Sequence, residues 1–139
     1  MSEKTKKVLT IIGIYFVAFT LARALSPLGG KLHLLFWKRY GCGGWGPCDS
    51  GAHLEGFIYL FIYLLAVVSF ALLKQKTAWK VYLWGTGLFW ILDMYIIITE
   101  DYERSIYVGG FIIMLVALAL GYGTGIGIKK LIEKFKKVK

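Results

Sequence analysis

The chain has 139 residues, of which 58% are hydrophobic and 17% aromatic, and its formal net charge is +9. A domain of this size cannot bury so much apolar surface, so the composition excludes an ordinary water-soluble globular protein. The basic residues gather at the ends of long apolar runs, which argues against nucleic acid as a partner and favours a membrane protein.

The first apolar run covers residues 8–25 and follows a short basic segment. Its length is close to the roughly 20 residues with which a helix crosses a bilayer core. The run is too long for the apolar part of a signal peptide, and no small-x-small cleavage site follows it, so we expect a retained span. Pro27, Gly29 and Gly30 then predict the end of this helix.

The next stretch, residues 26–56, is the most distinctive part of the chain because it contains both cysteines, both histidines and both prolines. Residues 31–40 are too short to cross a membrane, and their apolar stripe with basic edges predicts a short helix in the membrane interface. Residues 41–51 include five glycines and one proline, which predict a loop with tight turns.

Three further apolar runs, residues 56–73, 81–99 and 106–128, predict three more spans. The expected fold is therefore all-α: a single domain, residues 1–139, that forms a bundle of four transmembrane helices. One long loop joins the first two helices, and short turns join the others.

The distribution of Lys and Arg predicts the orientation of this bundle. With the amino terminus inside, the inner segments carry twelve basic residues and the outer segments carry five, including Arg23 at the margin. Cytoplasmic segments are enriched in Lys and Arg, so we expect a multi-pass protein of the cell membrane with both termini in the cytoplasm. The cysteine loop is then extracytoplasmic.

Cys42 and Cys48 admit three interpretations. On an oxidising side of the membrane they favour a structural disulfide that holds the glycine-rich loop. They also suit a redox dithiol that exchanges with protein partners or a quinone. With His33 and His53 they form a possible metal site, although the spacing departs from the usual zinc patterns. The sequence names no cofactor.

Asp93 lies six residues from the outer end of its predicted span, about 9 Å deep at the helical rise of 1.5 Å per residue. A carboxylate at that depth usually faces protein and has a partner. Arg23, His53 and Glu55 are expected in the same layer. They predict an outward-facing polar pocket that binds an ion, a proton or a small solute, or a structural ion pair between Arg23 and Asp93. A further alternative is that Arg23 extends to the lipid headgroups.

The last predicted span carries glycines at alternate positions, which form two interleaved G-x-x-x-G patterns. These residues are Gly121, Gly123, Gly125 and Gly127. Small residues allow close approach of helix backbones, so we expect this helix to pack on two sides.

We therefore expect a non-enzymatic protein of the lipid bilayer, either a small transporter-like unit or an accessory subunit that associates with copies of itself or with other membrane subunits. The alternatives are a membrane thiol-disulfide oxidoreductase that uses Cys42 and Cys48, and a metal-binding loop. The chain has no Asn and one Gln, a depletion found in proteins of thermophiles.

Overall fold

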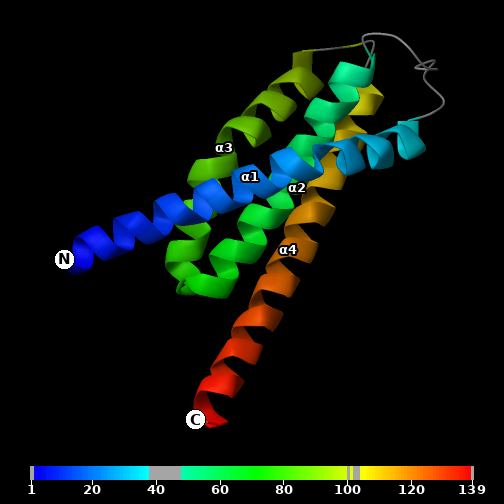
Figure 1. Cartoon of the computed structure of the whole chain (residues 1–139). Coiled ribbons are helices and arrows are strands. Elements are labelled where there is room, and N and C mark those ends of the chain that lie inside the picture. The colour runs from blue at the N-terminus through cyan, green and yellow to red at the C-terminus, as the bar shows by residue number, and fades with distance from the viewer. Residues whose placement is uncertain (1, 38–47, 100, 102–103, 139) are drawn as a thin grey trace.

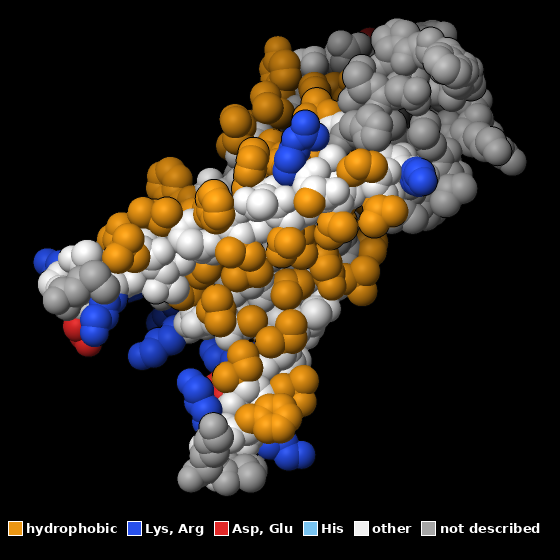
Figure 2. All heavy atoms as spheres, viewed as in Figure 1, with side chains coloured by type: hydrophobic (Ala, Val, Ile, Leu, Met, Phe, Trp, Pro, Cys, Tyr) orange, Lys and Arg blue, Asp and Glu red, His pale blue; other side chains and the backbone are white. Residues whose placement is uncertain are grey.

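The computed structural model describes residues 2–37, 48–99, 101 and 104–138, and all side chains among them except those at positions 32–37, 48–53, 106 and 138. These residues form four α-helices (Figure 1). The helices are α1 (Glu3–Trp37), α2 (Cys48–Leu72), α3 (Gln75–Thr99) and α4 (Arg104–Val138). Each contains a segment that is long and apolar enough to cross a membrane, so this part of the predicted fold is confirmed. Figure 2 shows hydrophobic side chains over much of the described surface, with most of the visible Lys and Arg side chains near the two termini.

The central helix of the bundle is α2. In its apolar segment 39% of the residues are buried, against 17% in each of the other three segments. Helix α2 makes its most extensive contacts with α1 and α4, while α3 packs more lightly against α2 and α4. Figure 1 shows α1 crossing α2 obliquely, and the free ends of α1 and α4 diverging so that the two termini lie apart.

The predicted end of the first helix at Pro27 is wrong, because α1 continues through this residue to Trp37. Proline lacks the N–H that would bond to the carbonyl group four residues earlier, which here belongs to Arg23. The Ser26 hydroxyl donates a hydrogen bond to that carbonyl at 2.9 Å. A neighbouring hydroxyl thus satisfies the group that the proline leaves free, and the helix is not interrupted.

The separate interfacial helix predicted over residues 31–40 is likewise absent, since residues 31–37 belong to α1. The predicted glycine-rich loop, residues 41–51, lies partly outside the described residues, and its last four positions already belong to α2. Helices α3 and α4 are also longer than the predicted spans, because their lysine-rich ends remain helical.

Gly29 and Gly30 form part of a helix contact instead of a helix end. A Cβ atom on Gly29 would lie 2.5 Å from the carbonyl oxygen of Gly56 in α2, so the two backbones touch here. Towards the amino terminus the same face of α1 buries Ile14 and then, at intervals of four residues, the small side chains of Ala18, Ala22 and Ser26. This stripe of small residues sets the close crossing of α1 over α2.

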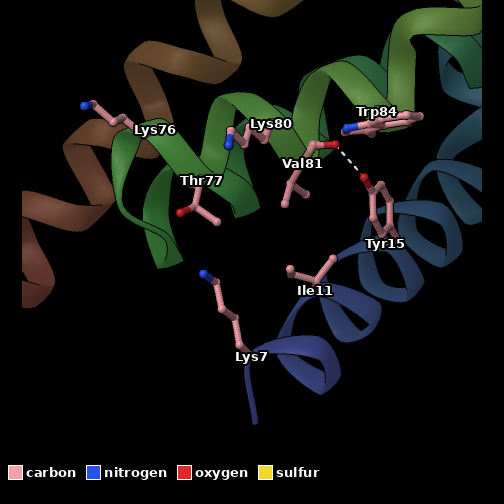
Figure 3. A pocket seen from close by; sticks show the side chains of 8 residues that line it. All are labelled: Lys7, Ile11, Tyr15, Lys76, Thr77, Lys80, Val81 and Trp84. Carbon is pink, nitrogen blue, oxygen red and sulfur yellow. Dashed lines mark hydrogen bonds between the residues drawn. The ribbon is translucent and has the colours of Figure 1, made fainter. Parts of the chain in front are cut away.

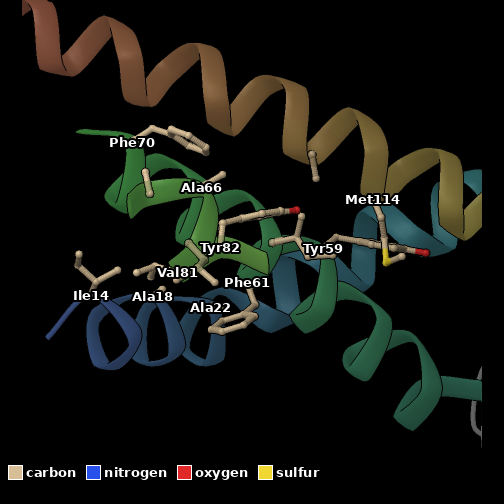
Figure 4. Close-up of a cluster of buried hydrophobic side chains, with 14 residues drawn as sticks. Ile14, Ala18, Ala22, Tyr59, Phe61, Ala66, Phe70, Val81, Tyr82 and Met114 are labelled. Atoms are coloured by element: carbon tan, nitrogen blue, oxygen red, sulfur yellow. The ribbon is translucent and has the colours of Figure 1, made fainter. Parts of the chain in front are cut away.

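The core lies on the faces of α2 that meet α1, α3 and α4 (Figure 4). Its members are mostly aliphatic or aromatic, with Ile62, Leu65 and Ala66 fully enclosed on α2. From α3 the core receives Tyr82, which is also fully buried, and from α4 Met114 and Ala117. The core therefore joins all four helices around α2.

The turn between α2 and α3 is tied to α4. Lys129 donates a hydrogen bond to the carbonyl oxygen of Leu73, just past the end of α2, at 3.1 Å. Beside it, Phe70, Trp79 and Tyr122 pack their rings with centroids 4.8–5.8 Å apart. Contacts of both kinds fix the start of α3 against α4 at the end of the bundle where the termini lie.

Helix α4 packs on α2 through only one of its two glycine patterns. A Cβ atom on Gly121 would lie 2.6 Å from the carbonyl oxygen of Tyr63, and one on Gly125 would lie 2.8 Å from that of Val67. By contrast, a Cβ atom on Gly123 or Gly127 would meet nothing within 4 Å. Within the described residues the predicted packing on two sides therefore reduces to one.

Candidate functional site

Two acidic side chains lie within electrostatic range of each other where α2, α3 and α4 converge, at the end of the bundle that contains the turn between α3 and α4. Glu55 projects from the first half of α2, and Asp93 lies on α3 six residues before its end. The Asp93 carboxylate acts electrostatically on Glu55. We call Glu55, Tyr59 and Asp93 the carboxylate cluster.

Tyr59 joins the cluster because it follows Glu55 by four residues and so lies on the same face of α2. Its hydroxyl group interacts with the Glu55 carboxylate and lies within the electrostatic range of Asp93. The Tyr59 side chain is 9% exposed, and Figure 4 shows it extending beside Met114 of α4. A Cβ atom on Gly110 would lie 3.2 Å from its hydroxyl oxygen, so glycine leaves room for the phenol.

The two acids are only partly exposed, and their charges are not balanced within the described residues. One oxygen of Asp93, Oδ2, is buried without a hydrogen-bond partner there. The ion pair found among the described residues joins Arg104 to Asp101 at 2.7 Å, in the turn between α3 and α4. It involves neither acid of the cluster. A proton or a positive charge would therefore stabilise this site.

The inner wall of the cluster is apolar. One turn further into the bundle, Trp90 of α3 packs edge to face on Phe111 of α4, with ring centroids 5.3 Å apart. The indole nitrogen of Trp90 donates a hydrogen bond to the Thr86 hydroxyl at 3.2 Å, which holds the ring in place. This pair of rings lies nearer the middle of the bundle than Asp93 does, by about one turn of α3.

Of the four residues predicted to form a polar layer, the structure brings Glu55 and Asp93 together. Arg23 is exposed on α1, and in the described residues it forms no ion pair with Asp93, so the predicted pairing of these two side chains is not found. His53 lies one turn before the cluster on α2, but its side chain is outside the described residues.

Arg23 and Asp93 were matched by depth alone, and depth does not decide which way a helix faces. The buried stripe of α1 passes through Ala22 and Ser26, which turns Arg23 outwards. Tyr59 and Gly110 were not among the residues predicted from the sequence. A signal for Tyr59 was present, since its spacing of four from Glu55 places a polar tip beside the acid.

The predicted disulfide and metal site concern residues whose side chains lie outside the described part of the chain. Cys42 and His33 belong to this group, and of Cys48 and His53 only the backbone is described, as the first turns of α2. Among the described side chains, no group of three metal-ligating residues gathers. Both proposals therefore stay predictions.

In comparison with known proteins, no family model, no curated protein and no solved structure matches the chain.

Proposed function

We propose that the chain is a small transporter-like membrane protein whose carboxylate cluster binds a proton or a small monovalent cation. The observation that carries this proposal is the buried Oδ2 atom of Asp93, which has no partner among the described residues and lies beside a second acid. Acidic side chains in membrane helices usually face a bundle interior and mark ion or proton pathways.

The chemistry of the cluster favours a hard cation. Its polar atoms are carboxylate oxygens and one phenol oxygen, which are the ligand types that hard cations prefer. Two carboxylates in surroundings of low dielectric constant repel each other, so a proton or a cation between them removes an unfavourable interaction. A soft metal would require sulfur or imidazole ligands, and the three members of the cluster supply neither.

The distribution of basic residues supports an orientation with both termini in the cytoplasm, in the cell membrane. In that orientation the carboxylate cluster lies towards the outer end of the bundle. The rings of Trp90 and Phe111 then lie on its inner side. We propose further that the protein works as an oligomer or with other membrane subunits, for which the open positions of Gly123 and Gly127 on α4 offer a surface for close helix contact.

The test uses purified protein in mild detergent and an apolar carbodiimide, which reacts with protonated carboxyl groups in apolar surroundings. We expect peptide mass analysis to find the label on Asp93 or Glu55, and labelling to slow when Na⁺ or K⁺ replaces choline at constant ionic strength. In proteoliposomes, Asp93→Asn should abolish the movement of that cation or of protons.

Asp101→Asn is the matched control. It removes an acid from the same end of the bundle, but one that is exposed and already paired with Arg104. Its labelling and ion movement should equal those of the wild type. If labelling responds neither to alkali cations nor to pH, or if Asp93→Asn moves ions as fast as the wild type, the proposed function is wrong.

A thiol oxidoreductase is the second candidate. It is favoured by the start of α2 at Cys48, because the amino terminus of a helix stabilises a thiolate. Intact-mass measurement with and without reductant tests whether Cys42 and Cys48 are joined. A bridge that is reduced and re-formed readily by the thiol pool of the cell envelope would favour this activity, whereas a resistant bridge would be structural.

A further inference from the structure

A groove of about 430 Å³ lies between α1 and α3 at the end of the bundle that contains both termini (Figure 3). We call it the lysine groove. Its lysine-lined mouth lies far from the carboxylate cluster, since Lys76 and Asp93 are 17 positions apart on α3, about 25 Å along a helix. A ligand in the lysine groove would therefore bind independently of the carboxylate cluster and of the function proposed for it.

The mouth of the groove is positively charged. Lys7 comes from α1, and Lys76 and Lys80 come from the first two turns of α3. Figure 3 shows Lys7 pointing across the mouth towards Thr77, whose hydroxyl group also borders the groove. Among the described residues that line it, none is acidic.

The start of α3 adds to this charge. The first turn of a helix carries the positive end of the helix dipole, which attracts anions. Two amides of this turn, those of Thr77 and Ala78, bond to the carbonyl oxygen of Lys74 at 2.9 and 2.8 Å. These bonds hold the turn in shape beside the lysines.

Beyond the lysines the groove becomes apolar. Ile11 and Val81 line its walls, and Trp84 borders it with 87% of its surface exposed. The deep side is closed by Tyr15, whose hydroxyl group donates a hydrogen bond to the Val81 carbonyl oxygen at 2.5 Å (Figure 3). A polar mouth and an apolar interior thus follow one another along the helices, in the order in which a lipid presents its headgroup and its chains.

We propose that the lysine groove binds an anionic phospholipid, with the phosphate of the headgroup among the three lysines and one acyl chain along Ile11, Val81 and Trp84. Lysines at a membrane surface attract anionic lipids, and basic pockets between membrane helices bind their headgroups. A free phosphate would use the lysines alone and would leave the apolar half of the groove in contact with water or detergent.

The main test is native mass spectrometry of the whole protein in mild detergent, titrated with phosphatidylglycerol or with phosphatidylcholine of the same chains. We expect one phosphatidylglycerol to bind in preference to phosphatidylcholine. The triple variant Lys7→Gln/Lys76→Gln/Lys80→Gln should weaken this binding by at least about tenfold, because each lysine near the headgroup contributes to the attraction.

The matched control is Lys134→Gln/Lys136→Gln/Lys137→Gln, which removes the same charge from the exposed end of α4. It should keep the wild-type affinity. If both triple variants lose affinity equally, the attraction is a general effect of net charge and the proposal is wrong. It is also wrong if phosphatidylcholine binds as tightly as phosphatidylglycerol, or if inorganic phosphate at millimolar concentration displaces the lipid.

A second measurement needs no change to the lysines. Phosphatidylglycerol with brominated chains should quench part of the tryptophan fluorescence of the wild-type protein at a low fraction in phosphatidylcholine vesicles. This part of the quenching should saturate as the groove fills. It should be missing in Trp84→Phe, which keeps an apolar ring. Equal quenching by brominated phosphatidylcholine at the same fraction would overturn the proposal.

Discussion

The contacts that α2 makes with α1 and α4 differ in kind from the contacts that α3 makes. Along the first two, backbone meets backbone at glycine, with Gly56 against Gly29 and Gly121 against Tyr63. Around α3, the contacts are between bulky side chains, with Trp79 packed on Phe70 of α2 and Tyr122 of α4. Helix α3 also packs more lightly than α1 and α4 do, and both the carboxylate cluster and the lysine groove include it.

This difference suggests a division of roles. Contacts between small residues give dispersion energy and close packing, which are the main forces between helices in a bilayer. A site that takes up a ligand needs space and unpaired polar groups, which such contacts exclude. We therefore expect substitutions on the α1–α2–α4 contacts to change stability, and substitutions around α3 to change binding.

The largest effect is expected for Gly56→Leu. The new side chain would occupy the space of the backbone at Gly29 and Gly30, which cannot move without separating α1 from α2. We expect a loss of more than about 3 kcal/mol in the free energy of unfolding, at the upper end for overpacked sites. Unfolding in mixed micelles with increasing dodecyl sulfate, followed by tryptophan fluorescence, measures this loss. Gly13→Leu is the control, since a Cβ atom there meets nothing within 4 Å.

A smaller effect is expected for Gly121→Leu, because α4 touches α2 here through one carbonyl group and the Cβ atom of Ala66. The expected loss in the free energy of unfolding is about 1–3 kcal/mol. Gly123→Leu, two residues further on, faces open space. We expect it to leave the free energy of unfolding unchanged or to raise it by up to about 1 kcal/mol, because leucine favours a helix more than glycine does. Equal losses in the two variants would mean that α4 packs on both sides, as the sequence alone suggested.

The smallest effect is expected for Ser26→Ala, which removes the hydroxyl group that bonds to the Arg23 carbonyl. Hydrogen bonds in membrane helices contribute about 0.6 kcal/mol on average, so we expect a loss of that size in the free energy of unfolding. Pro27→Ala restores the backbone N–H, and in that background Ser26→Ala should be nearly neutral. A double-mutant cycle measures the coupling, and strict additivity would contradict the role assigned to Ser26.

The sequence by itself determined that the chain is all-helical, with four segments long and apolar enough to cross a membrane. This conclusion depends on local properties, because the length and composition of one run decide whether a helix can span the bilayer core. Asp93 and Glu55 were also recognisable as candidates, since acids in or beside an apolar run need a reason to be there. The cysteine pair is an equally local observation, and its state stays a prediction.

Only the tertiary structure decided what each helix faces. Gly29 and Gly30 predict a break in isolation, yet opposite Gly56 they allow two helices to touch. The rotation of α1 turns Arg23 away from the bundle, and that of α3 brings Asp93 beside Glu55 instead. The lysine groove likewise exists because α1 and α3 diverge at their first turns. A rotation of 100° per residue separates neighbours in sequence on to different faces, so depth along a helix is readable from the chain, whereas direction depends on the helices packed around it.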